Sequence, residues 1–430
     1  MDGLLIRGVA LADWICPTRD GPGDLAVAGE RLVDPGSLVS PRVVDGSGLI
    51  ALPGLVDLHC HLRQPGQEQA ETVASGTAAA ARGGYTAVCA MPNLYPVTDT
   101  PERAQAIAQL GRRDGAAEVV PIGAISLGQQ GQRLADLAAL HRLAGVRLFS
   151  DDGHCVQSAR LMSQACAAVA GFGGVLAQHS QDSDLADSLA CCHSAERASR
   201  LGLEQWPATA ESVIVARDVQ LAAASGARLH VCHVSSGESV EIVRWAKARG
   251  VKVTAEVTPH HLLLPDDRME GGDTTFKVNP PLTDAADIEA LRQGLADGVI
   301  DAVATDHAPH TPADKASPFE RSKPGMLGLE QALAVVIETM VAEGRLDWAM
   351  LADRMSHAPA AIAGLGDRQG RPLRPGQPAN FVLIDPARRA VVDRARSRSR
   401  SRNNPYHGLD LPDPVVLTCW LGRLTHDGLA

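Results

Sequence analysis

Two histidines separated by one residue, His59 and His61 in the segment VDLHCHL, are the first residues in the chain whose types and spacing suggest chemistry. They end a short apolar run that has the composition of a buried β-strand. Because side chains alternate along a strand, residues two apart lie on the same face, where one metal ion can bind both imidazoles. By itself such a pair is a modest signal, since the same spacing also arises by chance.

Five later segments place further polar residues where apolar runs end. The residues are Asn93 in MPN, Asp151 and Asp152 in LFSDDG, His179 in AQHSQD, His233 in HVCHVSSG and Asp306 in ATDHAPH. Imidazole and carboxylate groups together are ligands that suit zinc. We therefore expect four histidines, Asp306 and one of the two adjacent aspartates to form a zinc site. Adjacency alone leaves open whether Asp151 or Asp152 is the ligand.

These residues can meet only if the strands that precede them converge. Eight short apolar segments recur along the middle of the chain, at residues 55–60, 85–91, 118–125, 146–150, 175–179, 228–233, 251–257 and 300–305. Alanine-rich segments with helical character lie between them, at 71–82, 100–113, 158–170, 212–225 and 238–249. Strands that alternate with helices predict a parallel (β/α)8 barrel of the TIM type. The carboxyl ends of barrel strands meet at one face, where active sites form.

Both ends of the chain differ from the middle, because short alternating stretches rich in Val, Leu and Gly indicate strands and turns. Since barrel termini lie close together, we expect the two ends to pair with each other. The predicted organisation is an α/β fold with a barrel at 53–367 and a smaller composite β-rich domain formed by 1–52 and 368–430. A chain of 430 residues is long enough for both parts.

Composition narrows the function further. The formal net charge of -10 argues against a general nucleic-acid binder, and no apolar run reaches the ~20 residues of a membrane-spanning helix. Nine cysteines without CxxC pairs are typical of reduced thiols, and the N-terminal segment lacks the basic region of a signal peptide. We therefore expect a cytoplasmic protein that acts on a small molecule, with no nucleic-acid or membrane partner.

A zinc site of this kind lowers the pKa of a bound water toward ~7 and so supplies hydroxide for hydrolysis. Asp306 is then the natural proton shuttle to a leaving nitrogen, in addition to its role as ligand. Arg63, shortly after the histidine pair, offers the fork of donors that pairs with a carboxylate. Asn93, Asn279 in KVNPPL and His310 in DHAPH offer further polar groups. Together they suggest a small anionic substrate with amide groups, although Arg63 could equally form an ion pair within the protein.

Residues 394–402 read RARSRSRSR. An arginine–serine tract can bind nucleic acid or act as a localisation signal. Such alternation is also typical of an exposed loop or edge strand. We favour this second interpretation because the tract is short and lies in an acidic chain.

With these residues located, the chain resembles dihydroorotases of the amidohydrolase superfamily, in particular the class I type. The segment DLHCHLRQPGQEQAETVASGTAAAARGGYTAVCAMPNLYPVTD looks like the first signature of that family, and EVTPHHL, KVNPPL and ATDHAPHT resemble later blocks in the correct order. GLIALPGLVDLHCH and NNPYHG extend the similarity over nearly the whole chain. HLRQPG and ATDHAPH are specific to dihydroorotases and close relatives, whereas HxH marks only the superfamily.

The resemblance implies a zinc enzyme, with one or two ions, that interconverts L-dihydroorotate and N-carbamoyl-L-aspartate in pyrimidine biosynthesis. The positions that match metal ligands are His59, His61, Asp151, His179, His233 and Asp306, with Asp306 as the acid–base group. The positions that match substrate contacts are Arg63, Asn93, Asn279, His310 and the backbone at Pro324 and Gly325 in KPGMLGLE. Relatives often have Glu in place of Gln181 and Lys in place of Ala70, and neither departure removes a ligand. A homodimer is expected, and association with aspartate carbamoyltransferase is compatible with the family.

Hydantoinases, dihydropyrimidinases and allantoinases are the nearest alternatives, because they share the expected fold and the type of bond cleaved. Many of them bridge two metals with a carboxylated lysine at the end of the fourth strand. This chain has five lysines, the first of which is Lys247, so that ligand is excluded here and Asp151 takes its place by resemblance. A non-catalytic dihydroorotase-like partner of aspartate carbamoyltransferase is the other alternative, and the complete set of ligands argues against it.

Overall fold

The computed structural model describes residues 3–15 and 22–429. Within these ranges, eight parallel strands surround the centre of the molecule in two arcs, β6-β7-β8 and β9-β10-β13-β14-β15. Bridges between Gly123 and Phe149 and between Cys60 and His307 join the arcs, which confirms the predicted barrel. The barrel strands are β6 (Leu55–Cys60), β7 (Tyr85–Ala90), β8 (Glu118–Pro121), β9 (Leu148–Phe149), β10 (Val175–Gln178), β13 (Arg228–Val231), β14 (Val253–Val257) and β15 (Ala302–Val303).

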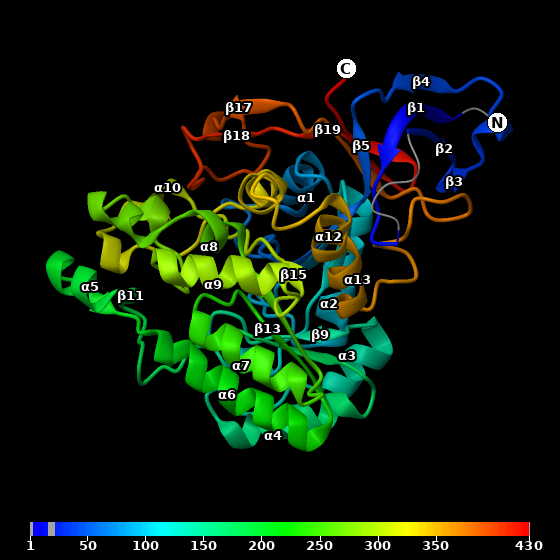
Figure 1. Ribbon diagram of the computed structural model, residues 1–430. Helices are drawn as coiled ribbons and strands as arrows, with labels where there is room; N and C mark the ends of the chain where they lie inside the picture. Colours follow the sequence, from blue (N-terminus) through cyan, green and yellow to red (C-terminus); the bar gives the residue numbers. More distant parts are fainter. Residues whose placement is uncertain (1–2, 16–21, 430) are drawn as a thin grey trace.

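Helices surround the barrel strands (Figure 1). Most begin at a Ser, Thr or Asp whose side chain accepts a backbone N–H of the first turn, as Thr72, Thr100, Ser158 and Ser236 do. Helix α4 buries Leu161, Met162, Ala165, Cys166 and Val169, the spacing of one apolar face. The main helices are α1 (Val73–Arg82), α2 (Pro101–Asp114), α3 (Leu137–Ala144), α4 (Ala159–Ala170), α6 (Ala208–Ser225), α7 (Gly237–Ala248), α9 (Ala285–Ala296) and α11 (Ala332–Val336).

Shorter elements lie in the connections and after the last barrel strand. They are β11 (Ala190–Cys192), α5 (Ala195–Leu201), β12 (Glu204–Gln205), α8 (Pro259–Leu263), α10 (Pro312–Lys315), α12 (Trp348–Ala352), α13 (Ala358–Ala363), β17 (Arg389–Val391) and β18 (Asp410–Pro412). Among the described residues, no helix is long and apolar enough to cross a membrane. The eight described cysteines are free thiols, as expected from their spacing, and Cys16 lies outside the described residues.

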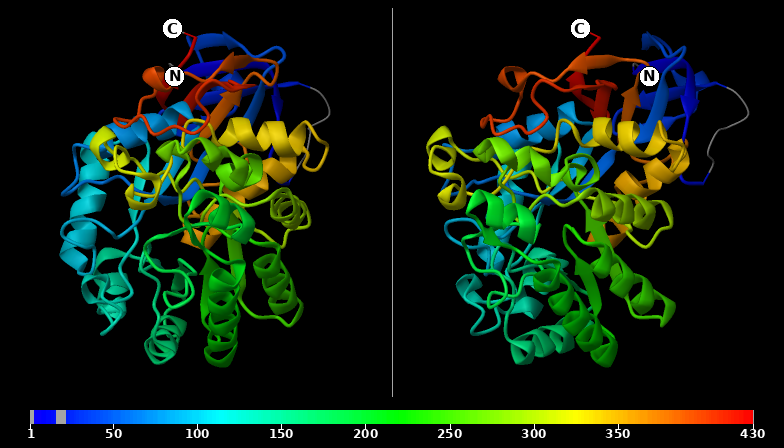
Figure 2. Two further views of the ribbon diagram at one scale, coloured as in Figure 1. Left: turned by 90° about the vertical axis from the view of Figure 1, so that its left-hand side faces the viewer. Right: turned by 60° about the vertical axis from the view of Figure 1, so that its left-hand side comes forward.

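Strands from both ends of the chain share one sheet, as predicted for the composite domain. Strand β5 pairs antiparallel with β16, so that Ile50 faces Ile384 and Pro53 faces Phe381. Figure 2 shows both chain ends at the same end of the molecule. The domain boundaries at 52/53 and 367/368 stay a prediction. The strands of this sheet are β1 (Leu4–Leu11), β2 (Gly23–Ala28), β3 (Arg31–Val33), β4 (Arg42–Asp45), β5 (Ile50–Pro53), β16 (Phe381–Ile384), β19 (Val415–Trp420) and β20 (Arg423–Asp427).

Residues 394–402, here called the arginine–serine strap, follow β17 and lie against the barrel. Ser399 and Ser401 are buried, whereas the arginines between and beside them are exposed. Ser399 Oγ donates to the Glu71 carboxylate, and Ser401 Oγ donates to the Ala70 carbonyl at 2.7 Å. The expected exposed loop is therefore correct for the arginines and wrong for these serines, because the serines attach the segment to the barrel.

Candidate metal centre

The barrel brings the expected polar residues to one mouth because each lies at or just beyond the carboxyl end of a strand. His59 lies in β6 and His61 follows it, while His179 follows β10 and His233 follows β13 by two residues. Asp306 lies three residues after β15. All five side chains are buried or nearly so.

Carboxylate and imidazole atoms approach one another closely in this cluster. Asp306 Oδ1 lies 3.0 Å from His61 Nε2 and 3.5 Å from His59 Nε2. On the other side, His179 Nδ1 and His233 Nε2 are 2.9 Å apart. Asp152 Oδ1 lies between the two groups, 3.3 Å from His59 Nε2, 3.8 Å from His179 Nδ1 and 3.9 Å from His233 Nε2. The residues therefore form two adjacent donor sets that share Asp152.

Asp151, expected from the resemblance to be the ligand, faces away from the histidines. Its Oδ1 accepts the backbone N–H groups of Ile125 at 2.9 Å and Ser126 at 3.0 Å, and the Ser126 hydroxyl donates to its other oxygen. The structure thus corrects the expectation: Asp152 is the aspartate of this pair that contacts the cluster. Asp151 instead fixes the loop after β8, because the backbone N–H groups of that loop donate hydrogen bonds to its carboxylate.

Three of the histidines are oriented by hydrogen bonds from the ring nitrogen that faces away from the cluster. His59 Nδ1 contacts Glu256 Oε1 at 2.8 Å, His61 Nδ1 contacts Asn93 Oδ1 at 3.0 Å, and His179 Nε2 contacts Gln181 Oε1 at 2.9 Å. If each outer nitrogen carries the proton, each inner nitrogen offers a lone pair to a metal. His59 Nε2 is buried without a hydrogen-bond partner, which fits a ligand to an ion.

Glu256 and His230 support the site and were not expected to do so. Glu256 Oε2 lies 2.9 Å from His230 Nε2, while its other oxygen holds His59. Burial alone would raise the pKa of Glu256, but hydrogen bonds from His230 and His59 lower it to about 2. Its signal in the sequence was a lone carboxylate inside the apolar run 251–257.

The electrostatics of the cluster favour a bound cation. Burial alone would raise the pKa of Asp152 and Asp306, but the charges and hydrogen bonds of the surrounding histidines, His59 first among them, lower both. Burial and the charge of His233 lower the pKa of His179 to about 4, so this imidazole is neutral at pH 7. Two ionised carboxylates beside a neutral imidazole are the donors that a divalent metal ion requires.

Three residues of the site have backbone conformations that non-glycine residues rarely adopt. The φ angles are 58° for Arg63, 32° for His233 and 42° for Asp306. Such conformations cost on the order of 1–3 kcal/mol each and concentrate at functional sites.

A cavity of about 370 Å³ opens over the cluster. Arg63 lines it and is buried, and its Nε donates to the Pro309 carbonyl at 3.2 Å. Within the described part of the chain, Arg63 has no carboxylate at ion-pair distance. The alternative of a structural ion pair therefore finds no support, and the guanidinium is left facing the cavity.

The other expected substrate residues also line this cavity, yet most of their polar groups are engaged. Asn279 Nδ2 donates to Gln181 Oε1 at 2.8 Å, and its Oδ1 is buried without a partner. His310 Nε2 lies 2.8 Å from the Pro324 carbonyl. The Gly325 N–H donates to the Lys277 carbonyl at 2.9 Å, and the Gly325 carbonyl accepts from Asn403 Nδ2 at 3.1 Å. Lys323 and His154 line the cavity as well, and neither was expected there.

Asn93 contacts two residues of the cluster at once. Its Oδ1 contacts His61 Nδ1, and its Nδ2 donates to Asp152 Oδ2 at 3.0 Å. Both ends of the amide are therefore used within the cluster. This placement differs from the expected contact with a substrate carboxylate.

The chain is similar over most of its length to proteins that are all named dihydroorotase. The family model described as "Dihydro-orotase-like" matches residues 48–239. The dihydroorotase of Streptomyces coelicolor is 50% identical over 408 residues, which cover 94% of this chain and 95% of that protein. The dihydroorotase of Mycobacterium leprae is 46% identical over 433 residues, covering 99% and 98% of the two chains.

Solved structures with the same fold are more distant in sequence. The L-hydantoinase (dihydropyrimidinase) from Arthrobacter aurescens has a TM-score of 0.87 at 22% identity, covering 100% of this chain and 97% of that one. The dihydropyrimidinase from Brevibacillus agri has a TM-score of 0.85 at 21% identity, with coverage of 99% and 95%. At this identity the likeness supports the fold alone.

Proposed function

The chain belongs to the dihydroorotase family, and we propose that it catalyses the reversible hydrolysis of L-dihydroorotate to N-carbamoyl-L-aspartate, a step of pyrimidine biosynthesis. The observation that best supports this substrate is the position of Arg63. Its guanidinium is buried, lacks a carboxylate partner among the described residues and faces the cavity that holds the histidine–aspartate cluster. An anionic ring amide supplies both the carboxylate that Arg63 lacks and a carbonyl for the cluster.

The metal is proposed to be zinc, because the donors are four imidazoles and two carboxylates. His59, His61 and Asp306 would hold one ion. His179 and His233 would hold a second together with Asp152, which also lies near His59. When bound, zinc lowers the pKa of a water toward ~7 and polarises a carbonyl. The shared position of Asp152 favours two ions over one.

Asp306 is the proposed acid–base residue. During ring opening, a C–O bond forms between water and the ring carbonyl carbon, and the C–N bond to the ring nitrogen breaks. Asp306 accepts the proton of the water and delivers it to the leaving nitrogen, and ring closure reverses these transfers. Because its pKa is lowered by the neighbouring histidines, Asp306 is ionised at neutral pH, which is the form that can accept a proton.

Arg63 is proposed to bind the substrate carboxylate, and the free Oδ1 of Asn279 to accept an N–H of the ring. His310, Pro324 and Gly325 line the same cavity and are proposed to limit the size of the ring. Because both ends of the Asn93 amide are engaged, we assign Asn93 to the orientation of His61 and Asp152.

The alternative of a hydantoinase-like enzyme is less well supported. Neutral cyclic amides would leave the buried charge of Arg63 without a partner, which costs free energy. The alternative of a non-catalytic partner of aspartate carbamoyltransferase would leave a complete ligand cluster without a role. The homodimer and the association with aspartate carbamoyltransferase remain predictions.

The experiment that tests the proposal combines metal analysis with the substitution Asp306→Asn. The wild type should carry about one or two zinc ions per chain and hydrolyse dihydroorotate. In Asp306→Asn, hydrolysis should fall on the order of 100-fold or more while part of the zinc remains. Hydrolysis that is unchanged in this variant would show that Asp306 is not the proton shuttle.

A further inference from the structure

The arginine–serine strap has no role in the proposed reaction, and its charges are left unmatched. Ser397 Oγ and the N–H groups of Arg398 and Ser399 donate to Glu330, while Ser399 Oγ and the Arg400 N–H donate to Glu71. This anchoring uses the inward face of the strap and leaves the arginines on the outer face. None of Arg394, Arg396, Arg398, Arg400 and Arg402 forms an ion pair with another described residue, whereas the nearby Arg82, Arg388 and Arg389 are all paired.

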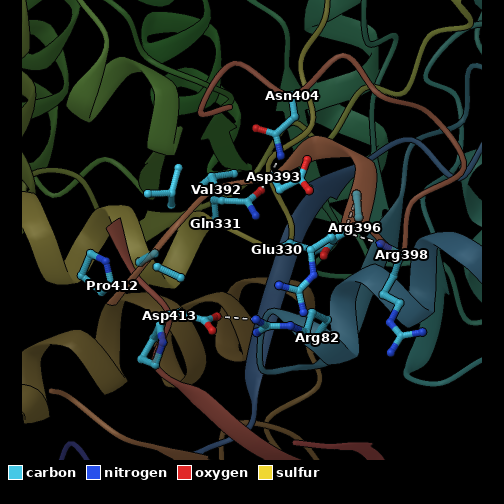
Figure 3. Close-up of a pocket in the computed structure, with 15 residues that line it drawn as sticks. Arg82, Glu330, Gln331, Val392, Asp393, Arg396, Arg398, Asn404, Pro412 and Asp413 are labelled. Atoms are coloured by element: carbon cyan, nitrogen blue, oxygen red, sulfur yellow. Dashed lines mark hydrogen bonds and ion pairs between the residues drawn. The ribbon is translucent and has the colours of Figure 1, made fainter. Parts of the chain in front are cut away.

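A pocket of about 420 Å³ lies beside the strap (Figure 3). Small organic ligands occupy pockets of ~300–1,000 Å³. Arg396 and Arg398 line it on the strap side, and Arg82, which forms an ion pair with Asp413, lies next to Arg396. Apolar residues of α11, β17 and β18, and the residue after β17, contribute the remaining wall, at Ala334, Ala390, Val391, Val392 and Pro412.

The acidic residues that line the pocket already accept hydrogen bonds or form ion pairs within the protein. Asp413 pairs with both Arg82 and Arg388. Glu330 accepts the three strap donors, and Asp393 Oδ1 accepts the Ala395 N–H at 2.9 Å. The guanidinium groups of Arg396 and Arg398 line the pocket as well, and neither has a hydrogen-bond or ion-pair partner among the described residues, so both are free to bind an anion.

We propose that this pocket binds a small organic phosphate. The phosphoryl group binds between Arg396 and Arg398, because guanidinium groups pair with phosphate oxygens through two parallel hydrogen bonds. An aromatic or heterocyclic part packs against the apolar wall at Val391, Val392 and Pro412. The pocket lies away from the metal centre and shares no lining residue with the catalytic cavity. The proposal therefore does not depend on the substrate assigned above.

Titration calorimetry of the zinc-loaded full chain with phenyl phosphate at low ionic strength tests the proposal. The test variant is Arg396→Ala/Arg398→Ala. The matched control is Arg394→Ala/Arg400→Ala, which removes the same charge from the same strap but leaves the pocket lining intact. All four side chains are exposed, so both variants should fold, and their dihydroorotate hydrolysis should equal that of the wild type.

Saturable binding should weaken about tenfold or more in the test variant and less than about twofold in the control. Equal weakening in both variants would mean that only the net charge of the strap affects binding, and this result would overturn the proposal. Unchanged binding in the test variant would place the ligand elsewhere, such as at the metal centre, and absence of saturable binding to the wild type would also overturn it. Inorganic phosphate should bind more weakly than phenyl phosphate, and equal affinity would exclude the apolar wall from the site.

Discussion

The carboxylates of Asp151 and Asp152 face opposite sides of one loop. Asp151 accepts the N–H groups of Ile125 and Ser126, whereas Asp152 lies 3.3 Å from His59 Nε2 and accepts from Asn93. Adjacent residues thus have two different contacts: Asp151 fixes the loop, and Asp152 belongs to the candidate metal centre. Substitution of each should therefore have a different consequence.

The substitution Asp152→Asn should remove most of the bound metal, because the shared carboxylate loses its charge. Loss of a group that merely orients a ligand weakens metal affinity about 10–100-fold, so loss of Asp152 should cost at least that much. Asp151→Asn is the matched control. It should keep the metal and lower the free energy of unfolding by about 1–2 kcal/mol, since a buried charged hydrogen bond is weakened. Metal analysis and denaturant unfolding measure the two effects, and metal loss confined to Asp151→Asn would show that the assignment is inverted.

Glu256→Gln should also weaken metal binding, although Glu256 lies outside the cluster. The substitution removes the charge that fixes His59 through Nδ1, and the expected decrease in metal affinity is about 10–100-fold. Glu211→Gln is a control for the loss of a buried carboxylate, because Glu211 contacts Ser235 and Ser236 rather than a histidine ring. Competition with a chelator compares the two variants. Equal metal affinity in both would contradict a specific role for Glu256.

Arg63→Met should discriminate between substrates with and without a carboxylate. For dihydroorotate, kcat/KM should fall about 10–100-fold, the expected effect of losing a charged hydrogen-bond pair. For dihydrouracil, which is the same ring without the carboxylate, the value should change little. Metal content should match the wild type because Arg63 contacts no ligand atom directly. An equal decrease with both substrates would mean that Arg63 supports the fold of the site rather than the carboxylate.

Lys315 connects by hydrogen bonds two loops beside the cavity, one at Thr274 and Lys277 and the other at Lys323. Its ammonium group donates to the carbonyls of Thr274 at 3.0 Å, Lys277 at 3.2 Å and Lys323 at 2.8 Å. Lys323 precedes the wall residues Pro324 and Gly325. Burial and the charge of Lys277 lower the pKa of Lys315 to about 7, with Asp273 and Asp314 acting in the opposite direction.

As pH rises through about 7, Lys315 loses one of the three N–H donors that hold these loops. The KM for dihydroorotate should therefore rise between about pH 6 and 8 in the wild type, and Lys315→Met should show a high KM, by about 3- to 10-fold, without this pH dependence. Stability should move the other way. The unfolded chain binds a proton at this lysine up to about pH 10.4, so the contribution of Lys315 to the free energy of unfolding increases between about pH 7 and 10. A KM that rises only where the whole protein unfolds would contradict a local role of Lys315 at the cavity wall.

The barrel could be predicted from sequence because its strands are buried on both faces. Such strands are continuous apolar runs, and the predicted segment 55–60 matches β6 residue for residue. The predicted segment 300–305 is longer than β15 (Ala302–Val303). Here the chain leaves the ladder early and reaches Asp306 with a positive φ, a local conformation that composition does not encode.

The orientation of Asp151 and Asp152 could not be predicted, because both lie beyond the end of β9, where the alternation of a strand no longer applies. The contact of Glu256 with His59 and His230 depends on the register of β14 against β13, which becomes visible only in the folded barrel. The buried serines of the strap likewise depend on Glu71 and Glu330, far away in sequence. The spacing of the polar residues in the sequence predicted which of them meet. Tertiary contacts decide which of their atoms face the candidate metal centre.

The measurement that tests the account most directly is kcat/KM of the purified, zinc-loaded protein for L-dihydroorotate, dihydrouracil and hydantoin. We expect dihydroorotate to be hydrolysed with the highest kcat/KM, by a factor of about 10 or more, because only this substrate offers a carboxylate to the buried Arg63. A higher kcat/KM for dihydrouracil or hydantoin would contradict the proposed substrate and would leave the charge of Arg63 unexplained.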